Sequence, residues 1–327
     1  MTCPPLRQRQ RGELMLHASP WPWSRRPPRQ FAGLRAIVTG GSSGVGRAVA
    51  LELARRGCRV VATARRQERL AELAAMAGEQ EPMLHEAGDI CDPGFRRHLV
   101  EVAVTRLGGL DLLVAAAGGG GIGRFRDVDP RLLDRILDLN LVAPAELVRE
   151  ALPHLTTGRD PAVVFIGSIL GLHPLPLHAA YAAAKSGLRS LAACLRVELA
   201  AEGIDVTLAS LGPVESEFWE SLLEGARPGW SRGRGMSPER AAEAILKGLA
   251  RRRAEIVPGW QAKGYAFLAR HAGGLIDRWA ARRLRRDSPA KAADEPTAHH
   301  PGPSSRADRF VTCQALPPPP GPGSGEP

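Results

Sequence analysis

Short runs of apolar and β-branched residues alternate with longer segments of helical periodicity through the middle of the chain. A continuous apolar run predicts a strand buried on both faces, and apolar positions at i, i+3 and i+4 predict the helix that covers it. The runs at 35–39, 59–64, 110–116, 162–167 and 205–210 predict strands, and the segments 46–56, 67–76, 130–152 and 179–202 predict helices. This alternation is typical of a single α/β domain, a doubly wound parallel sheet with helices on both faces, over residues 31–260.

Both ends of the chain differ from this middle. Residues 1–30 and 287–327 hold 16 of the 28 prolines. Such a composition cannot bury a core, so we expect a basic disordered tail before the domain and a Pro/Gly-rich disordered tail after it. Residues 261–286 combine aromatic and aliphatic side chains with late arginines and predict an amphipathic basic helix. That helix either lies on a membrane surface or packs back on the domain, and Gly273 and Gly274 disfavour one long straight helix.

The composition narrows the class of protein. With 44% hydrophobic and 24% charged residues, the 327-residue chain can bury a sizeable core. No apolar run approaches the ~20 residues that span a bilayer. The net charge is +10, but residues 31–260 carry only +1 of it. A DNA-reading fold is therefore disfavoured, and nucleic-acid contact through the basic tails is kept only as an alternative. Five scattered cysteines without a CxxC pair predict no metal site and a reducing compartment. We expect a cytoplasmic protein, and peripheral contact with a membrane surface stays open as an addition to that location.

A glycine-rich turn at 40–46 joins the first predicted strand to the first predicted helix. Glycines permit positive φ and close backbone approach, and the N–H groups at a helix N-terminus bind a pyrophosphate. The order of strand, glycine turn and helix therefore predicts a dinucleotide site in a Rossmann-like fold. The residues expected to form it are Thr39, Gly40, Ser42, Ser43, Gly44, Val45 and Gly46.

The end of the second predicted strand bears on the choice of cofactor. Arg65 and Arg66 stand where an NAD-binding protein is expected to place a carboxylate for the ribose hydroxyls. Arginine can instead pair with the 2′-phosphate of NADP, so NADP(H) is favoured, NAD(H) stays open, and ordinary surface arginines are the plain alternative. Asp89 and Ile90 follow the third strand region and are expected near the adenine ring. A turn or capping role is the alternative for Asp89.

Tyr181 and Lys185 lie four residues apart in a predicted helix, so both side chains emerge on one face. An unperturbed phenol titrates near ~10. Because a neighbouring ammonium favours the phenolate, we expect Lys185 to lower the pKa of Tyr181, which makes this hydroxyl a usable proton donor or acceptor. Ser168 follows the strand at 162–167, where its hydroxyl either holds the substrate oxygen or satisfies local backbone.

The set of motifs resembles the short-chain dehydrogenase/reductase family over residues 33–225. The resemblance rests, in the family's order and spacing, on Thr39-Gly40-x-x-x-Gly44-x-Gly46, Asp89, Asn140, Ser168, Tyr181-x-x-x-Lys185 and the segment 212–216.

This resemblance implies a role for each matching residue. Tyr181 is the general acid/base, Ser168 orients the substrate carbonyl, Lys185 binds the nicotinamide ribose, and Asn140 holds a water of a proton relay. The resemblance also implies a homo-oligomer that forms through the helices at 130–152 and 179–202. The further cofactor contacts expected are Ala116, Gly118, Gly212, Val214 and Ser216.

The chain departs from the family pattern in several places. Residues 115–118 read Ala-Ala-Ala-Gly where Asn-Asn-Ala-Gly is common, and three more glycines follow, so the Asn side chain that ties neighbouring strands is missing. Leu211 replaces the Pro of a Pro-Gly pair. Ser216 stands where Thr often meets the nicotinamide carboxamide, a hydrogen bond that a serine hydroxyl can also make. A substrate lid is expected over 214–236, and its aromatic residues suit an apolar substrate or serve only to pack the lid.

We therefore expect an NADP(H)-dependent oxidoreductase that transfers hydride between nicotinamide and an apolar or lipid-like ketone or secondary alcohol. A catalytically weak cofactor-sensing or scaffold protein of the same fold is the alternative, because the segment 115–121 is altered. His173 and His178 are expected to be wall or surface residues, since no partner carboxylate is evident for them in the sequence.

Overall fold

The computed structural model describes residues 26–78, 83–220, 222–225 and 235–286. Among these residues, seven parallel strands form one sheet in the order β3-β2-β1-β4-β5-β6-β7. Every apolar run that predicted a strand contains one, whereas the two-residue β7 is too short to give a pattern of its own. The strands are β1 (Arg35–Thr39), β2 (Arg59–Ala64), β3 (Leu84–Ala87), β4 (Leu112–Ala115), β5 (Ala162–Ser168), β6 (Asp205–Leu211) and β7 (Glu255–Ile256).

The helices include two, α3 and α7, that were not predicted. Asp92 and Ser237 cap them directly before a proline, which is a start signal readable in the sequence. The segment predicted as one helix over 130–152 is interrupted, because the π-helical turn η2 inserts around Asn140. The helices are α1 (Gly44–Arg55), α2 (Gln67–Ala77), α3 (Pro93–Leu107), α4 (Pro130–Leu137), α5 (Ala143–Leu155), α6 (Ala179–Glu198), α7 (Pro238–Ala250) and α8 (Trp260–Arg286), with short turns η2 (Asp138–Val142), η3 (Ile169–Gly171) and η4 (Glu217–Trp219).

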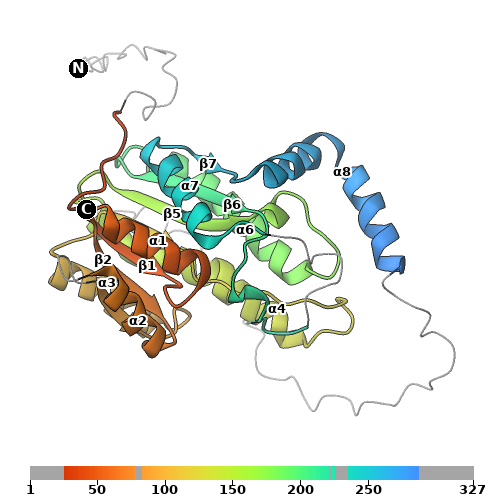
Figure 1. Ribbon diagram of the computed structural model, residues 1–327, viewed down its shortest axis with the longest axis horizontal. Coiled ribbons are helices and arrows are strands. Elements are labelled where there is room, and N and C mark those ends of the chain that lie inside the picture. Colours follow the sequence, from red (N-terminus) through yellow and green to blue (C-terminus); the bar gives the residue numbers. More distant parts are fainter. Residues whose placement is uncertain (1–25, 79–82, 221, 226–234, 287–327) are drawn as a thin grey trace, which may run out of the picture. The chain divides into compact units, whose positions relative to one another are not determined.

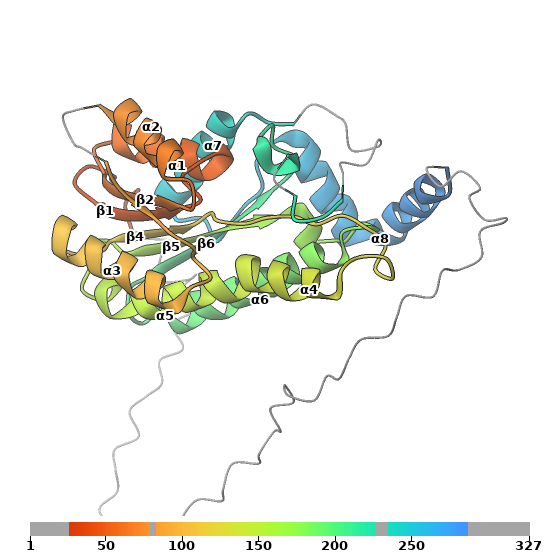
Figure 2. The same ribbon diagram turned by 90° about the horizontal axis from the view of Figure 1, so that it is seen from below.

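Each face of the sheet carries its own hydrophobic core. Helices α1, α2 and α7 lie on one side of the sheet, and α3, α5 and α6 lie on the other (Figure 2). Along β1, Ala36 and Val38 belong to the first core and Ile37 to the second, as the alternation of side chains in a strand requires. Because both faces are covered, the central strands are apolar throughout, and the predicted doubly wound α/β fold is confirmed.

The order of the strands reverses at β1, which lies between β2 and β4. From β1 the chain builds β2 and β3 on one side and β4 to β7 on the other. In an open α/β sheet, the loops that leave the two strands at such a point diverge and create a crevice at their carboxyl ends. The turn at 40–43 and the loop after β4 therefore border the expected ligand site.

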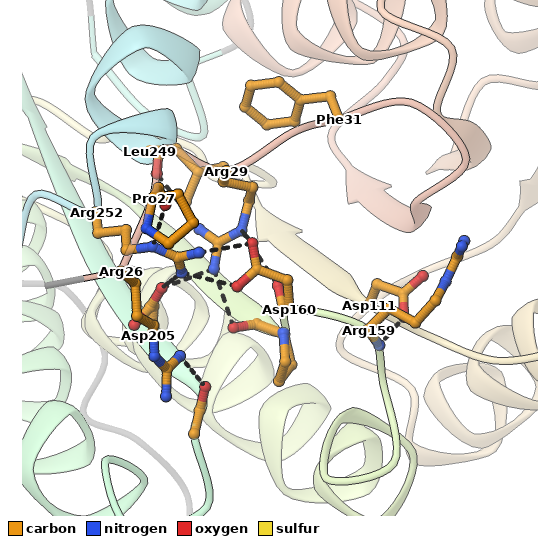
Figure 3. Close-up of polar contacts among 12 residues, drawn as sticks. Arg26, Pro27, Arg29, Phe31, Asp111, Arg159, Asp160, Asp205, Leu249 and Arg252 are labelled. Carbon is orange, nitrogen blue, oxygen red and sulfur yellow. Dashed lines mark hydrogen bonds and ion pairs between the residues drawn. The ribbon is translucent and has the colours of Figure 1, made fainter. Parts of the chain in front are cut away.

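Residues that precede β1 belong to the folded domain. The Arg29 side chain, in a residue only 2% exposed, donates to the carbonyl oxygen of Pro161 and to the Asp205 carboxylate, the latter at 2.7 Å (Figure 3). Arg252 pairs with the same carboxylate at 2.6 Å. The folded domain therefore includes Arg29, which precedes the start predicted at residue 31. Most of the two predicted tails, 1–25 and 287–327, lies outside the described residues.

Helix α8 is bent near its middle. Its backbone leaves the helical region at Ala272 (φ −150°, ψ 42°), directly before Gly273 and Gly274, whose effect on a long straight helix was expected. The two halves appear as separate blue segments in Figure 1. Within the part of the chain that the structure describes, no helix is both long and apolar enough to cross a membrane.

Candidate active site

One cavity of about 1330 Å³ opens at the carboxyl ends of the central strands. Loops that follow β1, β2, β4, β5 and β6 contribute to its wall, together with α6 and α8. The structure brings every candidate catalytic and cofactor-binding residue to this wall: Thr39, Gly40, Ser42, Ser43, Gly44, Val45, Gly46, Arg65, Arg66, Asp89, Ile90, Ala116, Gly118, Asn140, Ser168, Tyr181, Lys185, Gly212, Val214 and Ser216.

The glycine turn is a tight backbone cradle. Gly40 has φ +74°, and a Cβ there would lie 2.9 Å from the carbonyl oxygen of Ala116. At Gly46 a Cβ would lie 2.4 Å from the Gly40 carbonyl oxygen. Ser43 is the N-cap of α1, but its side chain makes no capping hydrogen bond, so the cap leaves the first N–H groups of the helix to another acceptor. These features fit the pyrophosphate of a dinucleotide.

Thr39 ties the two central strands together at the edge of the cavity. Its Oγ1 accepts hydrogen bonds from the backbone N–H groups of Ala116 and Ala117, at 3.0 and 2.9 Å. The sequence lacks an asparagine that could tie the strands at this point, and this hydroxyl makes a tie from β1 instead. On the adjacent strand β2, in register with Thr39, the Thr63 hydroxyl is buried and has no hydrogen-bond partner among the described residues. A ligand with a polar group suits that position.

The end of β2 is cationic. Arg65 and Arg66 are both exposed, and Arg66 donates to Glu217 Oε2 at 2.9 Å and to Ser42 Oγ at 3.2 Å. After the neighbouring strand β3, Asp89 Oδ1 accepts a hydrogen bond from the backbone N–H of Cys91 at 2.9 Å. Asp89 therefore has the turn role that was its alternative, in addition to its place on the cavity wall.

Three candidate proton-handling groups meet where β5 ends and α6 begins. Tyr181 and Ser168 both line this corner of the cavity, and the Ser168 side chain lowers the pKa of the Tyr181 phenol. Ser168 Oγ accepts a hydrogen bond from the backbone N–H of Leu170 at 3.2 Å, so it satisfies local backbone, which was one of the two roles considered for this hydroxyl. The Lys185 Nζ lies 5.6 Å from the centroid of the Tyr181 ring and donates to the carbonyl oxygen of Ile166 at 2.9 Å.

The expectation that Lys185 lowers the pKa of Tyr181 is wrong for this structure. Burial raises the pKa of Tyr181 to about 12, and the hydrogen bond with Ser168 opposes that rise only in part. Burial also lowers the pKa of Lys185 to about 8. Both shifts have one cause, because a site shielded from water disfavours the charged form of each group. A buried lysine whose pKa falls to about 8 next to a buried tyrosine is typical of a functional site, because perturbed pKa values cluster where groups exchange protons.

Asn140 is fully buried in the π-helical turn η2. Its Nδ2 donates to the carbonyl oxygens of Gly119 and Ile136, at 2.9 and 3.0 Å, and its Oδ1 accepts from the Gly119 N–H at 3.4 Å. A Cβ on Gly118 would lie 2.9 Å from Oδ1 and 3.6 Å from the Lys185 Nζ. Asn140 therefore joins the glycine run after β4 to the helix that ends at the turn, next to Lys185.

The glycine run is also where the lid is attached. The N–H of Leu223 donates to the Gly120 carbonyl oxygen at 2.8 Å, and the N–H of Ile122 donates to the Glu224 carbonyl oxygen at 2.9 Å. The Phe218 ring stands edge-on to the Tyr181 ring, with centroids 5.7 Å apart. The glycines after β4, which depart from the family pattern, therefore have a packing role, because they allow the lid to approach the backbone.

Helix α8 forms the outer wall of the cavity and is joined to the loop after β5. The Tyr265 hydroxyl donates to the carbonyl oxygen of His173 at 2.8 Å, and His173 Nε2 lies 2.9 Å from Asp277 Oδ1. His173 therefore has the partner carboxylate that was not evident in the sequence, because that carboxylate stands 104 residues later. The α8 residues that line the cavity are Gln261, Ala262, Tyr265, Leu268, Leu275, Ile276 and Trp279.

The chain is similar to known proteins over this domain. The family model described as short chain dehydrogenase matches residues 35–227. An uncharacterized oxidoreductase of Myxococcus xanthus (strain DK1622) is 34% identical over 264 residues, which are 76% of this chain and 97% of that protein. A short chain dehydrogenase of Pseudocercospora fijiensis is 35% identical over 196 residues, but the match spans only 58% of this chain and 62% of that protein.

A solved structure has the same fold. The crystal structure of a short-chain dehydrogenase from Streptomyces avermitilis superposes with a TM-score of 0.65 at 27% identity. The superposition covers 76% of this chain and 95% of the other chain.

Proposed function

The chain belongs to the short-chain dehydrogenase/reductase family and is an NAD(P)-dependent oxidoreductase, and from that premise we propose that it uses NADP(H) to interconvert an apolar ketone and its secondary alcohol. The observation that carries the proposal is that Tyr181, Ser168 and the buried Lys185 line one cavity, with the Lys185 Nζ 5.6 Å from the centroid of the Tyr181 ring. These groups lie in the same cavity as the glycine cradle.

A bound nicotinamide supplies or accepts the hydride, and the chain's own residues handle the proton. Tyr181 Oη donates a proton to the carbonyl oxygen during reduction and accepts it during oxidation. Ser168 Oγ, on the same cavity wall, holds that substrate oxygen in place. Lys185 binds the nicotinamide ribose, and Asn140 fixes the glycine run next to Lys185.

The preference for NADP(H) is supported by the charge at the end of β2. Arg65 and Arg66 present two guanidinium groups on the cavity wall, and β2 ends in Ala64 without a carboxylate. A planar guanidinium pairs with a phosphate monoester through two parallel hydrogen bonds, whereas the ribose hydroxyls of NAD(H) prefer an acidic residue.

The proposal of an apolar substrate is supported by the apolar side chains that line the cavity. Phe218, Leu222 and Leu223 of the lid and Leu268 and Ile276 of α8 line it. An apolar wall around a few convergent polar groups selects a substrate with a hydrophobic body and one reactive oxygen.

The test is a fluorescence titration of NADPH and NADH, followed by turnover on a panel of apolar ketones and aldehydes. We expect tighter binding of NADPH, a loss of about 1.5–3 kcal/mol of binding free energy with Arg65→Ala, and turnover that Tyr181→Phe abolishes while nucleotide binding persists. Nucleotide binding without turnover across the panel would instead favour the alternative of a cofactor-sensing or scaffold protein.

Peripheral membrane contact through α8 is a second part of the proposal. Trp260, Phe267 and Leu275 are 81%, 67% and 52% exposed, and Leu275 also lines the cavity. Exposed apolar residues on a helix that also lines a substrate cavity suit contact with a lipid surface. The cations around them complement anionic lipids: Lys263, Arg270, Arg278, Arg282, Arg283, Arg285 and Arg286.

The free thiols of Cys58, Cys91 and Cys194 support a reducing, cytoplasmic location.

Flotation with phosphatidylcholine vesicles, with and without phosphatidylglycerol, tests this contact. We expect the protein to float with the anionic vesicles only, and to stop floating when Arg282, Arg285 and Arg286 are replaced by Gln. Replacement of Arg97, Arg106 and Arg131 by Gln removes equal charge elsewhere and should leave flotation unchanged. If both variants lost flotation equally, binding would depend only on net charge, and a specific contact through α8 would be contradicted.

A homo-oligomer is the third part of the proposal. Val142 and Val197, on the helical segments at 130–152 and 179–202, are 45% and 59% exposed, and apolar side chains at such positions suit a contact between copies. Light scattering after gel filtration is expected to report a dimer or tetramer, and Val197→Asp is expected to shift it toward monomer.

A further inference from the structure

Glu217, in the lid, pairs with two arginines at the start of α2. Its carboxylate lies 2.9 Å from Arg66 Nη1 and 3.8 Å from Arg69 Nη2. Arg66 Nη2 in turn donates to the hydroxyl of Ser42, in the glycine turn, at 3.2 Å. Three separate segments therefore meet at one cluster: the turn after β1, the start of α2, and the first residue of η4.

Glu217 links this cluster to the proposed catalytic tyrosine through its neighbours in the lid. The adjacent residue, Phe218, packs edge-on against Tyr181, with ring centroids 5.7 Å apart. On its other side, Ser216 lies against the glycine turn, where a Cβ on Gly44 would be 3.1 Å from the Ser216 Cβ. Glu217 is thus the point at which a segment packed on the proposed catalytic tyrosine is held by charge to the end of β2.

The cluster has the donors that a phosphate monoester needs. Two guanidinium groups and a hydroxyl can together surround a dianion, and a carboxylate satisfies the same donors with one charge fewer. The pairs are half exposed, with side-chain exposures of 46% for Arg66 and 36% for Glu217, so water and a ligand can reach them. A phosphate placed here would compete with Glu217 for the arginines and would also be repelled by its charge.

We propose that Glu217 is a cofactor-selectivity residue whose carboxylate competes with the 2′-phosphate of NADP(H) for Arg66 and Arg69 and leaves NAD(H) binding unaffected. The inference rests on the nucleotide site of the proposed function. When the phosphate binds, Arg66 exchanges one anion for the other and releases Glu217, so the lid loses its ionic contact with α2. With NAD(H) bound, the contact between Glu217 and Arg66 persists.

The experiment measures dissociation constants for NADPH and NADH by cofactor fluorescence on wild type, Glu217→Gln and Glu220→Gln. Glu220→Gln is the matched control, because it removes the same charge from an exposed residue of the same lid. Since a half-exposed ion pair contributes modestly, Glu217→Gln is expected to tighten NADPH binding about two- to fivefold while NADH binding stays constant. Raising the salt concentration should shrink this gain, because exposed charges are screened.

A second variant identifies the route of the effect. In an Arg66→Ala background the gain from Glu217→Gln should shrink, since the main contested donor is absent. The ratio of the two dissociation constants decides the matter whichever cofactor the wild type prefers. An unchanged ratio in Glu217→Gln, or an equal change in Glu220→Gln, overturns the role of Glu217 and leaves the oxidoreductase proposal standing. Absence of binding for both nucleotides overturns the two together.

Discussion

The ring of Phe218 lies so close to Gly120 that a Cβ on residue 120 would stand 2.6 Å from the Phe218 Cζ. Since Phe218 also packs against Tyr181, the glycine run after β4 determines how near the lid comes to the proposed catalytic hydroxyl. The departure of this run from the usual family pattern is therefore explained by packing.

Gly120→Ala is expected to displace Phe218 and, with it, the lid that covers Tyr181. A displacement of about 1 Å at a reacting centre lowers kcat/KM about 10- to 100-fold. Steady-state kinetics with a ketone substrate measure the loss. Gly264→Ala is the control, because a Cβ there meets nothing within 4 Å. Equal kinetics for the Gly120→Ala variant and wild type would contradict the steric argument.

Arg29→Ala is expected to destabilise the domain by about 3–5 kcal/mol, because it leaves the buried Asp205 carboxylate with fewer cationic partners. Urea unfolding followed by circular dichroism gives the free energy of unfolding. Arg26→Ala is the matched control, since Arg26 makes an exposed hydrogen bond with the Gly203 carbonyl oxygen. A similar small loss in both variants would mean that the network in Figure 3 contributes little to stability.

Lys185 is expected to give the protein a pH-dependent stability. Burial lowers its pKa from 10.5 to about 8, so between those values the unfolded chain binds more protons at this side chain than the folded chain. Lys185 therefore contributes a rise in the free energy of unfolding with pH across that window, on the order of 3 kcal/mol. The thiols of Cys58 and Cys91, whose pKa values burial raises from 9.0, contribute a fall above about pH 9, so the effect of Lys185 is a difference between variants. Urea unfolding between about pH 7.5 and pH 10 should give a more positive slope in wild type and in the Lys263→Met control than in Lys185→Met. Parallel curves for all three proteins would contradict the buried charge.

Tyr265→Phe removes the hydroxyl that donates to the His173 carbonyl oxygen at 2.8 Å. We expect a loss of about 1 kcal/mol in the free energy of unfolding, the usual net contribution of one hydrogen bond. Because Tyr265 lines the cavity, the KM for an apolar substrate should rise more than kcat falls. A change in kcat alone would place Tyr265 closer to the reaction than the cavity wall.

The sequence determined the features that depend on local spacing. The apolar runs predicted the parallel sheet because a strand covered on both faces must be apolar along its length. The glycine turn predicted a nucleotide cradle because strand, turn and helix are contiguous, and Tyr181 and Lys185 could be placed on one face because helical geometry fixes residues four apart. Helices α3 and α7 also had readable caps at Asp92 and Ser237.

Which distant residues meet, and what each environment does to them, depends on the tertiary fold. Arg66 meets Glu217 across 151 positions and His173 meets Asp277 across 104, and no local pattern encodes such pairs, since they depend on the path of the whole chain. The direction of the Tyr181 pKa was likewise beyond the sequence. The spacing to Lys185 suggested a lowered value, whereas burial, which arises from packing by many elements, raises it to about 12.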